Sequence, residues 1–278
     1  MQKTVTDYQN FLGRVQNEIM SHQVIHNNEY TRWFAKGGFS LEQAKHFVTQ
    51  FSVFSNLFII AQLKKVINSE TLEEMHRAKE ILLNELGVIF NFGGKETESQ
   101  KSIRAQDAEN LGDPEVVVAE GTIEGGTFKF KAAHFEWLLV LGKSLELGFS
   151  DLGKAKHGTK TTLHFTDALA EIYGSENFST AAGASYAVEN WAAAGFWKEL
   201  IQGLKTFREK NNLKLPLAFF TWHDKVEEQH ATHTQDELKE IFYYEKFDED
   251  EFIRAGQKML DACLVFWNGL NADRKISA

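Results

Sequence analysis

Three side chains suited to binding iron or zinc recur at helical spacing in one segment of the chain. Glu227 and His230 follow His223 by four and seven positions. At about 100° per residue, the three positions fall within about 60° of one another on one helical face. Imidazole and carboxylate groups are ligands that such metals accept. The spacing is compatible with a metal site, and also with an ordinary solvated face of a charged helix.

Metal sites in helical bundles draw ligands from several helices, so other acids and histidines matter. Glu189 lies in an Ala- and Tyr-rich segment, where a buried acid would need a partner. Glu85 ends an apolar helical stripe, and His134 begins an apolar segment. Each residue has an ordinary alternative. Glu189 could lie at a helix boundary on the surface, Glu85 could be a last-turn charge, and His134 could be a cap or a hydrogen-bonded core residue.

Long helices are expected to position these groups. Ser40 followed by Gln43 makes a capping-box pattern, and the aromatic spacing that follows predicts a largely buried helix over about 41–67. The chain has only two prolines, which permits a mostly helical architecture. Apolar periodicity predicts the other helices at about 4–20, 70–86, 133–146, 162–174, 179–206, 216–244 and 249–271.

A different pattern interrupts the helices after residue 90. Residues 91–114 have no apolar period and predict a loop, whereas Val116–Val118 and Thr127–Lys131 flank a glycine-rich turn and predict a β-hairpin at about 115–132. The sequence therefore predicts an all-α bundle of about seven helices in a single domain, 1–278, with a loop and β-hairpin inserted at about 90–132.

Composition narrows the class of partner. The chain is 43% hydrophobic and 25% charged, as in ordinary globular proteins, and its net charge of −9 argues against nucleic-acid binding. The longest apolar run, around Leu57–Ala61, is too short to span a bilayer, and the polar N-terminus lacks a signal-peptide core. Cys263 is the only cysteine, which excludes an internal disulfide and a cysteine metal cluster. We expect a cytoplasmic protein without a membrane partner.

Taken together, the candidate residues follow an order that resembles the heme-oxygenase-like di-iron oxidases, whose fold is related to the TenA and PqqC proteins. That family places a Glu late in one helix, then a His before a Leu-rich segment, a Glu in an Ala/Tyr-rich helix, and finally His-x-x-x-Asp/Glu-x-x-His. The matching elements here are Asn84-Glu85-Leu86-Gly87, His134, Tyr186-Ala187-Val188-Glu189 and His223…Glu227…His230. The resemblance spans most of the chain outside 90–132.

The resemblance implies two ferrous ions that react with O2 and a small substrate that resembles a fatty acid or an amino acid. It also implies two unequal iron sites and is compatible with a homodimer. Glu85, Glu189, Glu227 and His230 would form the more complete iron site, and His134 and His223 would hold the other.

The sequence departs from the family pattern in three places. The family's first core helix usually supplies another Glu, but no Asp or Glu occurs between Glu42 and Glu70, which leaves one iron ion as an alternative to two. Glu227 stands where Asp is usual. The insertion separates Glu85 from His134 by more residues than usual.

The helix expected over about 41–67 is also predicted to form one wall of a substrate pocket. By the resemblance, Gln50, Phe51, Phe54 and Tyr186 would line it, although a Phe stripe at helical spacing is also ordinary core packing. Two other functions remain open: a metal-free enzyme like the PqqC or TenA branches, and a non-catalytic interaction protein. TenA-type thiamine-degrading chemistry uses a nucleophilic cysteine, and Cys263 lies in the last helix, away from the motifs.

Overall fold

The structure is a computed structural model that describes residues 3–91, 120–123, 126–130 and 134–276. Within these residues the chain forms eleven α-helices. They are α1 (Val5–Arg14), α2 (Gln23–His26), α3 (Glu29–Phe34), α4 (Leu41–Ile67), α5 (Leu72–Glu85), α7 (His134–Lys143), α8 (Lys160–Ala168), α9 (Phe178–Ala192), α10 (Phe196–Lys210), α11 (Ala218–Ile241) and α12 (Glu249–Ile276).

Four short helical turns extend or join these helices. Two of them are π-helical: η1 (Val15–Met20) continues α1, and η4 (Leu169–Tyr173) continues α8. The other two are 3₁₀ turns, η2 (Phe149–Asp151) and η3 (Ala155–His157), in the connection between α7 and α8. π-Helical turns are rare and often occur near functional sites, and η4 ends at Tyr173.

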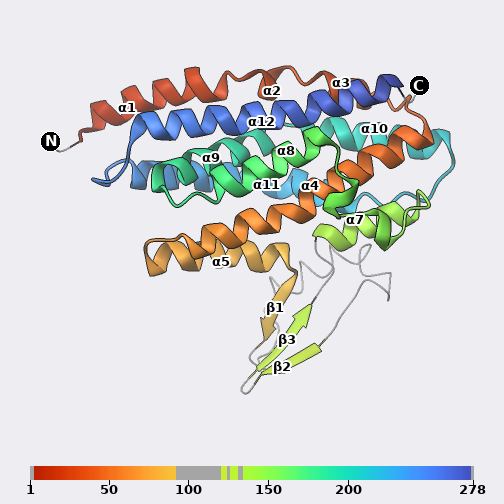
Figure 1. Cartoon of the computed structure of the whole chain (residues 1–278), viewed down its shortest axis with the longest axis horizontal. Helices are drawn as coiled ribbons and strands as arrows, with labels where there is room; N and C mark the ends of the chain where they lie inside the picture. Colours follow the sequence, from red (N-terminus) through yellow and green to blue (C-terminus); the bar gives the residue numbers. More distant parts are fainter. Residues whose placement is uncertain (1–2, 92–119, 124–125, 131–133, 277–278) are drawn as a thin grey trace.

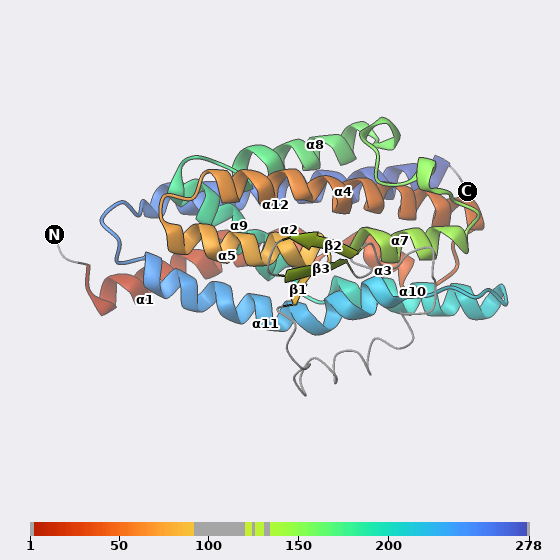
Figure 2. The ribbon, with the colours of Figure 1, turned by 90° about the horizontal axis from the view of Figure 1, so that it is seen from below.

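The long helices run roughly parallel to one another in a layered bundle (Figure 1). α12 packs against α9 and α8, and the N-terminal helices α1–α3 lie along its outer side. α4 packs against α5, α7 and α8, while α11 packs against α9 and α10. Seen from below, α5 and α7 follow one another along the same side of the bundle (Figure 2). Residues from both halves of the sequence therefore contribute to one apolar core.

Local sequence signals account well for α4. It begins after Ser40, whose hydroxyl accepts a hydrogen bond from the Gln43 backbone while the Gln43 side chain accepts one from the Ser40 backbone. The predicted range of 41–67 is thus confirmed, together with its capping box. By length and composition α4 could also cross a membrane, but half of its most apolar window is buried, as in the core helix of a bundle.

The number of helices differs from the prediction of about seven. The single helix expected over 179–206 is two helices, α9 and α10, because Gly195 has φ of +97°, in the left-handed region that ends a helix. The helix expected over 4–20 is α1 followed by a π-helical turn, and the short helices α2 and α3 were not predicted.

Close packing of α9 on α12 depends on a glycine. A Cβ atom added to Gly183 would lie 2.2 Å from the backbone oxygen of Phe252 in α12. The two backbones can approach this closely only because position 183 has no side chain. This contact sets how closely α9, the helix that carries Ser185 and Glu189, packs on α12.

A small antiparallel sheet projects from the bundle beyond α5 (Figure 1). Its strands are β1 (Val88–Asn91), β2 (Glu120–Ile123) and β3 (Gly126–Phe130), in the order β1-β3-β2. The register pairs Val88 with Phe130 and Glu120 with Lys129. The two-stranded hairpin expected at about 115–132 is corrected in two ways: a third strand joins it from before the loop, and β2 starts at Glu120. Val116–Val118 lie outside the described residues.

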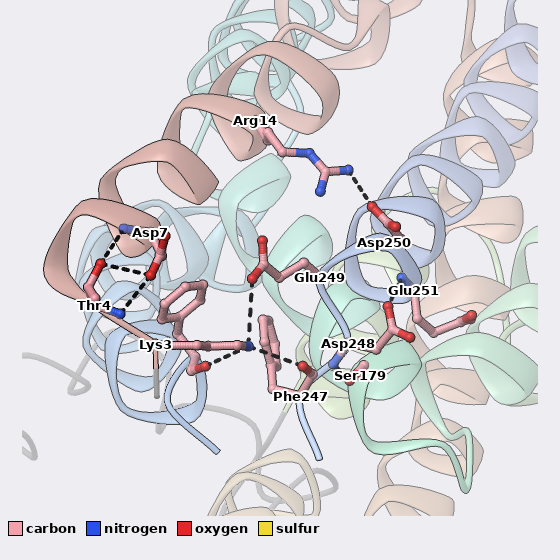
Figure 3. A network of polar contacts seen from close by, with 11 residues as sticks. Lys3, Thr4, Asp7, Arg14, Ser179, Phe247, Asp248, Glu249, Asp250 and Glu251 are labelled. Atoms are coloured by element: carbon pink, nitrogen blue, oxygen red, sulfur yellow. Dashed lines mark hydrogen bonds and ion pairs between the residues drawn. The ribbon is translucent and has the colours of Figure 1, made fainter. Parts of the chain in front are cut away.

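The N-terminal segment is tied to the connection between α11 and α12 (Figure 3). The Lys3 ammonium donates hydrogen bonds to the backbone oxygens of Phe242 (2.9 Å) and Phe247 (3.1 Å) and lies 4.5 and 4.7 Å from the centres of their rings. It also pairs with Glu249 at 3.6 Å. Carbonyl oxygens and aromatic faces both attract a cation, so Lys3 holds the two chain segments together.

Candidate functional site

The main cavity of the described structure lies between α4, α5, α9 and α11. Its volume is about 670 Å³, enough for a ligand of drug-like size. One part of its wall is aromatic, and charged side chains from α5, α9 and α11 form another part. The aromatic lining residues are Phe51, Phe54, Phe58, Phe178, Tyr186, Trp191, Trp197, Phe219, Trp222 and Phe252.

Three of the six predicted metal ligands line this cavity. Glu85 is the last residue of α5, Glu189 lies in α9, and His223 lies in α11. Both carboxylates are half-buried, and His223 is only 8% exposed. Helices far apart in the sequence thus bring two acids and one imidazole to the wall of one cavity.

The His223 ring is held in a defined orientation. Its Nδ1 atom lies 2.6 Å from the backbone oxygen of Phe219, one turn earlier in α11. A carbonyl oxygen can only accept, so Nδ1 carries a proton, and in the neutral ring the lone pair would then be on Nε2. The ring also stacks on Trp197, with ring centres 4.7 Å apart and planes inclined by 23°. This is the tautomer and the restraint that a metal-binding histidine needs.

The other three predicted ligands are placed by their backbone only. Glu227 and His230 continue α11 beyond His223, and His134 is the first residue of α7. Their side chains lie outside the described part of the structure. Among the described side chains, no three His, Cys, Asp or Glu residues form a group that could hold a metal ion. Glu85, Glu189 and His223 therefore share the cavity without completing a metal centre by themselves.

The predicted pocket residues divide into two groups. Phe51, Phe54 and Tyr186 line the cavity. Gln50 does not; its Nε2 donates to the backbone oxygen of His157, and its Oε1 accepts from the Thr159 backbone and the Thr162 hydroxyl, each at 2.8 Å. The placement of Gln50 in the pocket is corrected, because its amide faces the start of α8.

A polar cluster in the cavity wall was not predicted. Lys65 in α4 donates to Ser185 Oγ in α9 at 2.9 Å, and Gln62 Nε2 donates to the hydroxyl of Tyr173 at 3.1 Å. Tyr173 is the last residue of the π-helical turn η4. We call Gln62, Lys65, Tyr173 and Ser185 the polar cluster. The sequence holds a signal for half of it, since the Phe51, Phe54, Phe58 stripe continues at helical spacing to Gln62 and Lys65.

Charges around the polar cluster keep its lysine protonated. Burial lowers the pKa of the Lys65 ammonium, but Tyr173, Glu237 and Glu189 more than offset this effect, and the pKa is raised. Burial raises the pKa of the Tyr173 hydroxyl. Lys65 is therefore a permanent cation in the cavity wall, close to the Glu189 carboxylate that was expected to bind iron.

Ion pairs join α5 to neighbouring elements around the cavity. Arg77 in α5 pairs with Glu240 in α11 at 3.6 Å. Lys246, which follows α11, pairs with Glu70 and with Glu74 (3.6 Å), and lies 3.9 Å from the centre of the Phe178 ring. These contacts tie the start of α5 to α9 and α11, the helices that carry Glu189 and His223.

Comparison with solved structures identifies the architecture. One match is a domain of unknown function with a heme oxygenase-like fold from Shewanella denitrificans OS217, with a TM-score of 0.56 and 14% identity over 98% of this chain and 95% of the other. A second is a TenA homologue protein from P. horikoshii OT3, with a TM-score of 0.53 and 13% identity over 94% of this chain and 97% of the other. The chain has the heme-oxygenase-like fold.

The heme-oxygenase-like fold confirms the predicted architecture at the level of the fold alone. No family model matches the chain, and no curated protein matches its sequence. In this heme-oxygenase-like bundle, the cavity with Glu85, Glu189 and His223 lies between α4, α5, α9 and α11. A fold of this kind does not determine function, which depends on the residues of the cavity.

Proposed function

We propose that the protein is an iron-dependent enzyme that uses O2 to oxidise a small organic molecule bound in the main cavity. The observation that carries the proposal is that Glu85, Glu189 and His223, from three separate helices, all line the same cavity. Sites that combine imidazole and carboxylate ligands with open positions suit non-heme iron. Glu227, His230 and His134 would complete the ligand set.

Each described group would have a separate task. The hydrogen bond from His223 Nδ1 to Phe219 keeps the ring oriented, and Nε2 would be the atom that coordinates iron. Glu85 and Glu189 would contribute anionic oxygen ligands from α5 and α9. Iron held there would supply the one-electron and O2 chemistry that amino-acid side chains lack.

The apolar wall would bind the substrate and exclude water. Phe54, Phe58 and Trp191 line the cavity and are closely surrounded by other rings; for example, the centres of Phe54 and Phe165 are 5.0 Å apart. A packed aromatic wall favours an apolar substrate body and reduces water near the reacting groups.

Anaerobic loading with ferrous iron tests the proposal. We expect one or two tightly held iron ions per chain by elemental analysis, and a transient visible absorption after O2 is added. Glu189→Gln and His223→Phe should each reduce the bound iron at least tenfold, while Glu171→Gln, an exposed acid on η4, should leave it unchanged. Retention of the full iron content by both ligand variants would contradict the proposal.

One observation favours a second candidate, a metal-free enzyme of the same fold. The Lys65 ammonium already lies close enough to Glu189 and Glu237 to have its pKa raised by them. It could neutralise the carboxylates that a metal would otherwise neutralise. On this alternative, the protein binds no iron after anaerobic loading but still binds its substrate in the cavity.

A further inference from the structure

The cavity lining is strongly acidic. Among its described residues are two cations, Lys65 and Arg77, against eight carboxylates. Arg77 pairs with Glu240, and Lys246 from outside the lining pairs with Glu70 and Glu74. The carboxylates of the lining are Glu70, Glu74, Glu85, Glu176, Glu189, Asp236, Glu237 and Glu240.

The lining still has more carboxylates than cations when the proposed metal ligands are left out of the count. If Glu85 and Glu189 are engaged by iron, Glu176, Asp236 and Glu237 still line the cavity, with Lys65 as the nearby cation. Glu176 and Asp236 are exposed, so water screens their charges, whereas the half-buried Glu237 carboxylate is screened less. An anionic ligand would be repelled from this lining and a cationic ligand attracted to it.

A buried acceptor independently points to a ligand with a hydrogen-bond donor. Gln62 is fully buried and lines the cavity, yet its Oε1 atom has no hydrogen-bond partner in the described structure. Buried polar atoms are nearly always satisfied, and an exception calls for a ligand or water. A carbonyl oxygen can only accept, so the missing partner must carry an N–H or O–H group.

The two ends of the Gln62 amide are placed differently. Its Nε2 donates to the Tyr173 hydroxyl at 3.1 Å, whereas its Oε1 is the end without a partner in the described structure. The Lys65 ammonium donates to Ser185 Oγ and lies 4.9 Å from the centre of the Tyr173 ring.

We infer that the cavity binds an organic ammonium ion with an apolar body, whose N–H groups meet Gln62 Oε1 while the surrounding carboxylates compensate its charge. The inference rests on the proposed function, because it takes this cavity to be the substrate site. It narrows the substrate from a fatty-acid-like or amino-acid-like molecule to an amine. The apolar body lies along Phe54, Phe58 and Trp191, whose ring faces also attract a cation.

Three eight-carbon probes of equal length test the charge preference: octylamine, octanoate and 1-octanol. Alkylamines, like lysine, have a pKa near about 10.4 and are protonated at neutral pH. Isothermal titration at pH 7.5 is done with the full chain as isolated and again after chelation of metals. We expect octylamine to bind at least tenfold more tightly than the other two probes. Octanoate binding as tightly as octylamine would overturn the inference.

Two substitutions at Gln62 test the site itself. Gln62→Leu removes the acceptor and should weaken octylamine binding about tenfold, as for loss of a hydrogen bond to a charged group. Its effect on 1-octanol should stay within about twofold on the same scale. Gln62→Glu, which adds a negative charge at the same place, should tighten octylamine binding. Glu171→Gln is the control. An unchanged octylamine affinity in both Gln62 variants would overturn the inference.

The outcomes separate the inference from the proposed function. Octylamine binding by metal-free protein, together with failure to take up iron, would overturn the iron-dependent reaction and leave the amine site standing. Normal iron uptake with no preference among the three probes would overturn the amine site alone. Circular dichroism of each Gln62 variant verifies that it folds, so that a lost affinity is read as a lost contact.

Discussion

Lys65 donates a hydrogen bond of 2.9 Å from its ammonium group to the hydroxyl of Ser185, which lies one helical turn before Glu189. The contact joins α4 to α9 on the cavity wall. It places a cation in α4, a helix that has no Asp or Glu after Glu42. A positive side chain and a metal ion both stabilise nearby carboxylates, so the role of Lys65 bears directly on the choice between the two candidate functions.

Replacing Lys65 should therefore affect stability. Lys65→Met removes a cation from beside Glu189 and Glu237 and the donor to Ser185 Oγ, and should lower the free energy of unfolding by about 1–2 kcal/mol. Urea denaturation measures the change. Lys64→Met is a matched control, because Lys64 is exposed in the same last turn of α4. Equal stability of the two variants would show that Lys65 does not stabilise the cavity wall.

Gln50 should behave as a structural residue. Gln50→Leu keeps the size of the side chain but removes three hydrogen bonds to His157, Thr159 and Thr162. We expect a loss of about 2–4 kcal/mol in the free energy of unfolding, because buried partners lose their bonds. Binding of octylamine should be unchanged in the folded variant. Gln202→Leu, at an exposed site in α10, should have little effect on unfolding. Weakened octylamine binding without a lower free energy of unfolding would show that Gln50 does contact the ligand.

Phe51 should contribute mainly to the core although it also reaches the cavity. It is fully buried, and its ring lies 5.3–6.4 Å from the ring centres of Phe54 and Phe266, among others. Phe51→Ala should cost about 3–5 kcal/mol, the usual range for a buried Phe. Phe149→Ala, where the ring is 63% exposed, should cost less than about 1 kcal/mol. Thermal and urea unfolding compare them, and similar stabilities would contradict this assignment.

Cys263 should be unreactive in the folded protein. Burial raises the pKa of its thiol well above the ordinary value, and it is not among the described cavity-lining residues. A thiol-specific chromogenic reagent at pH 8 should therefore react slowly with the native chain and rapidly in urea. Fast labelling of the native chain would restore Cys263 as a candidate nucleophile.

The raised pKa of Cys263 also predicts how the stability of the protein changes with pH. Because the folded chain holds the Cys263 proton more tightly than the unfolded chain, the free energy of unfolding should fall as pH rises above the ordinary thiol pKa of about 8.5. Below that pH the contribution of Cys263 is constant. Cys263→Ala should lose this part of the pH dependence, which urea titrations from pH 7 to 10 would measure.

The residues that the sequence identified correctly share a local cause. The start of α4 follows from the capping box of Ser40 and Gln43, and its continuation from the apolar period that begins at Phe47, all within one helix. The division between α9 and α10 was missed although Gly195 lies at the break, because glycine is tolerated inside helices and its φ of +97° is set by the packing on either side. Gln50 was misplaced for a similar reason: its partners lie more than a hundred residues away.

The sequence by itself determined the helical character of the chain, because hydrogen bonds within a helix join residues four positions apart. It also gave the order of the candidate ligands along the chain. Only the tertiary structure decided which side chains share a cavity. It brought Gln62 and Lys65 to Tyr173 and Ser185, and it turned Gln50 away. Such meetings depend on how several helices pack against one another, and packing is a sum of many long-range contacts that no short segment encodes.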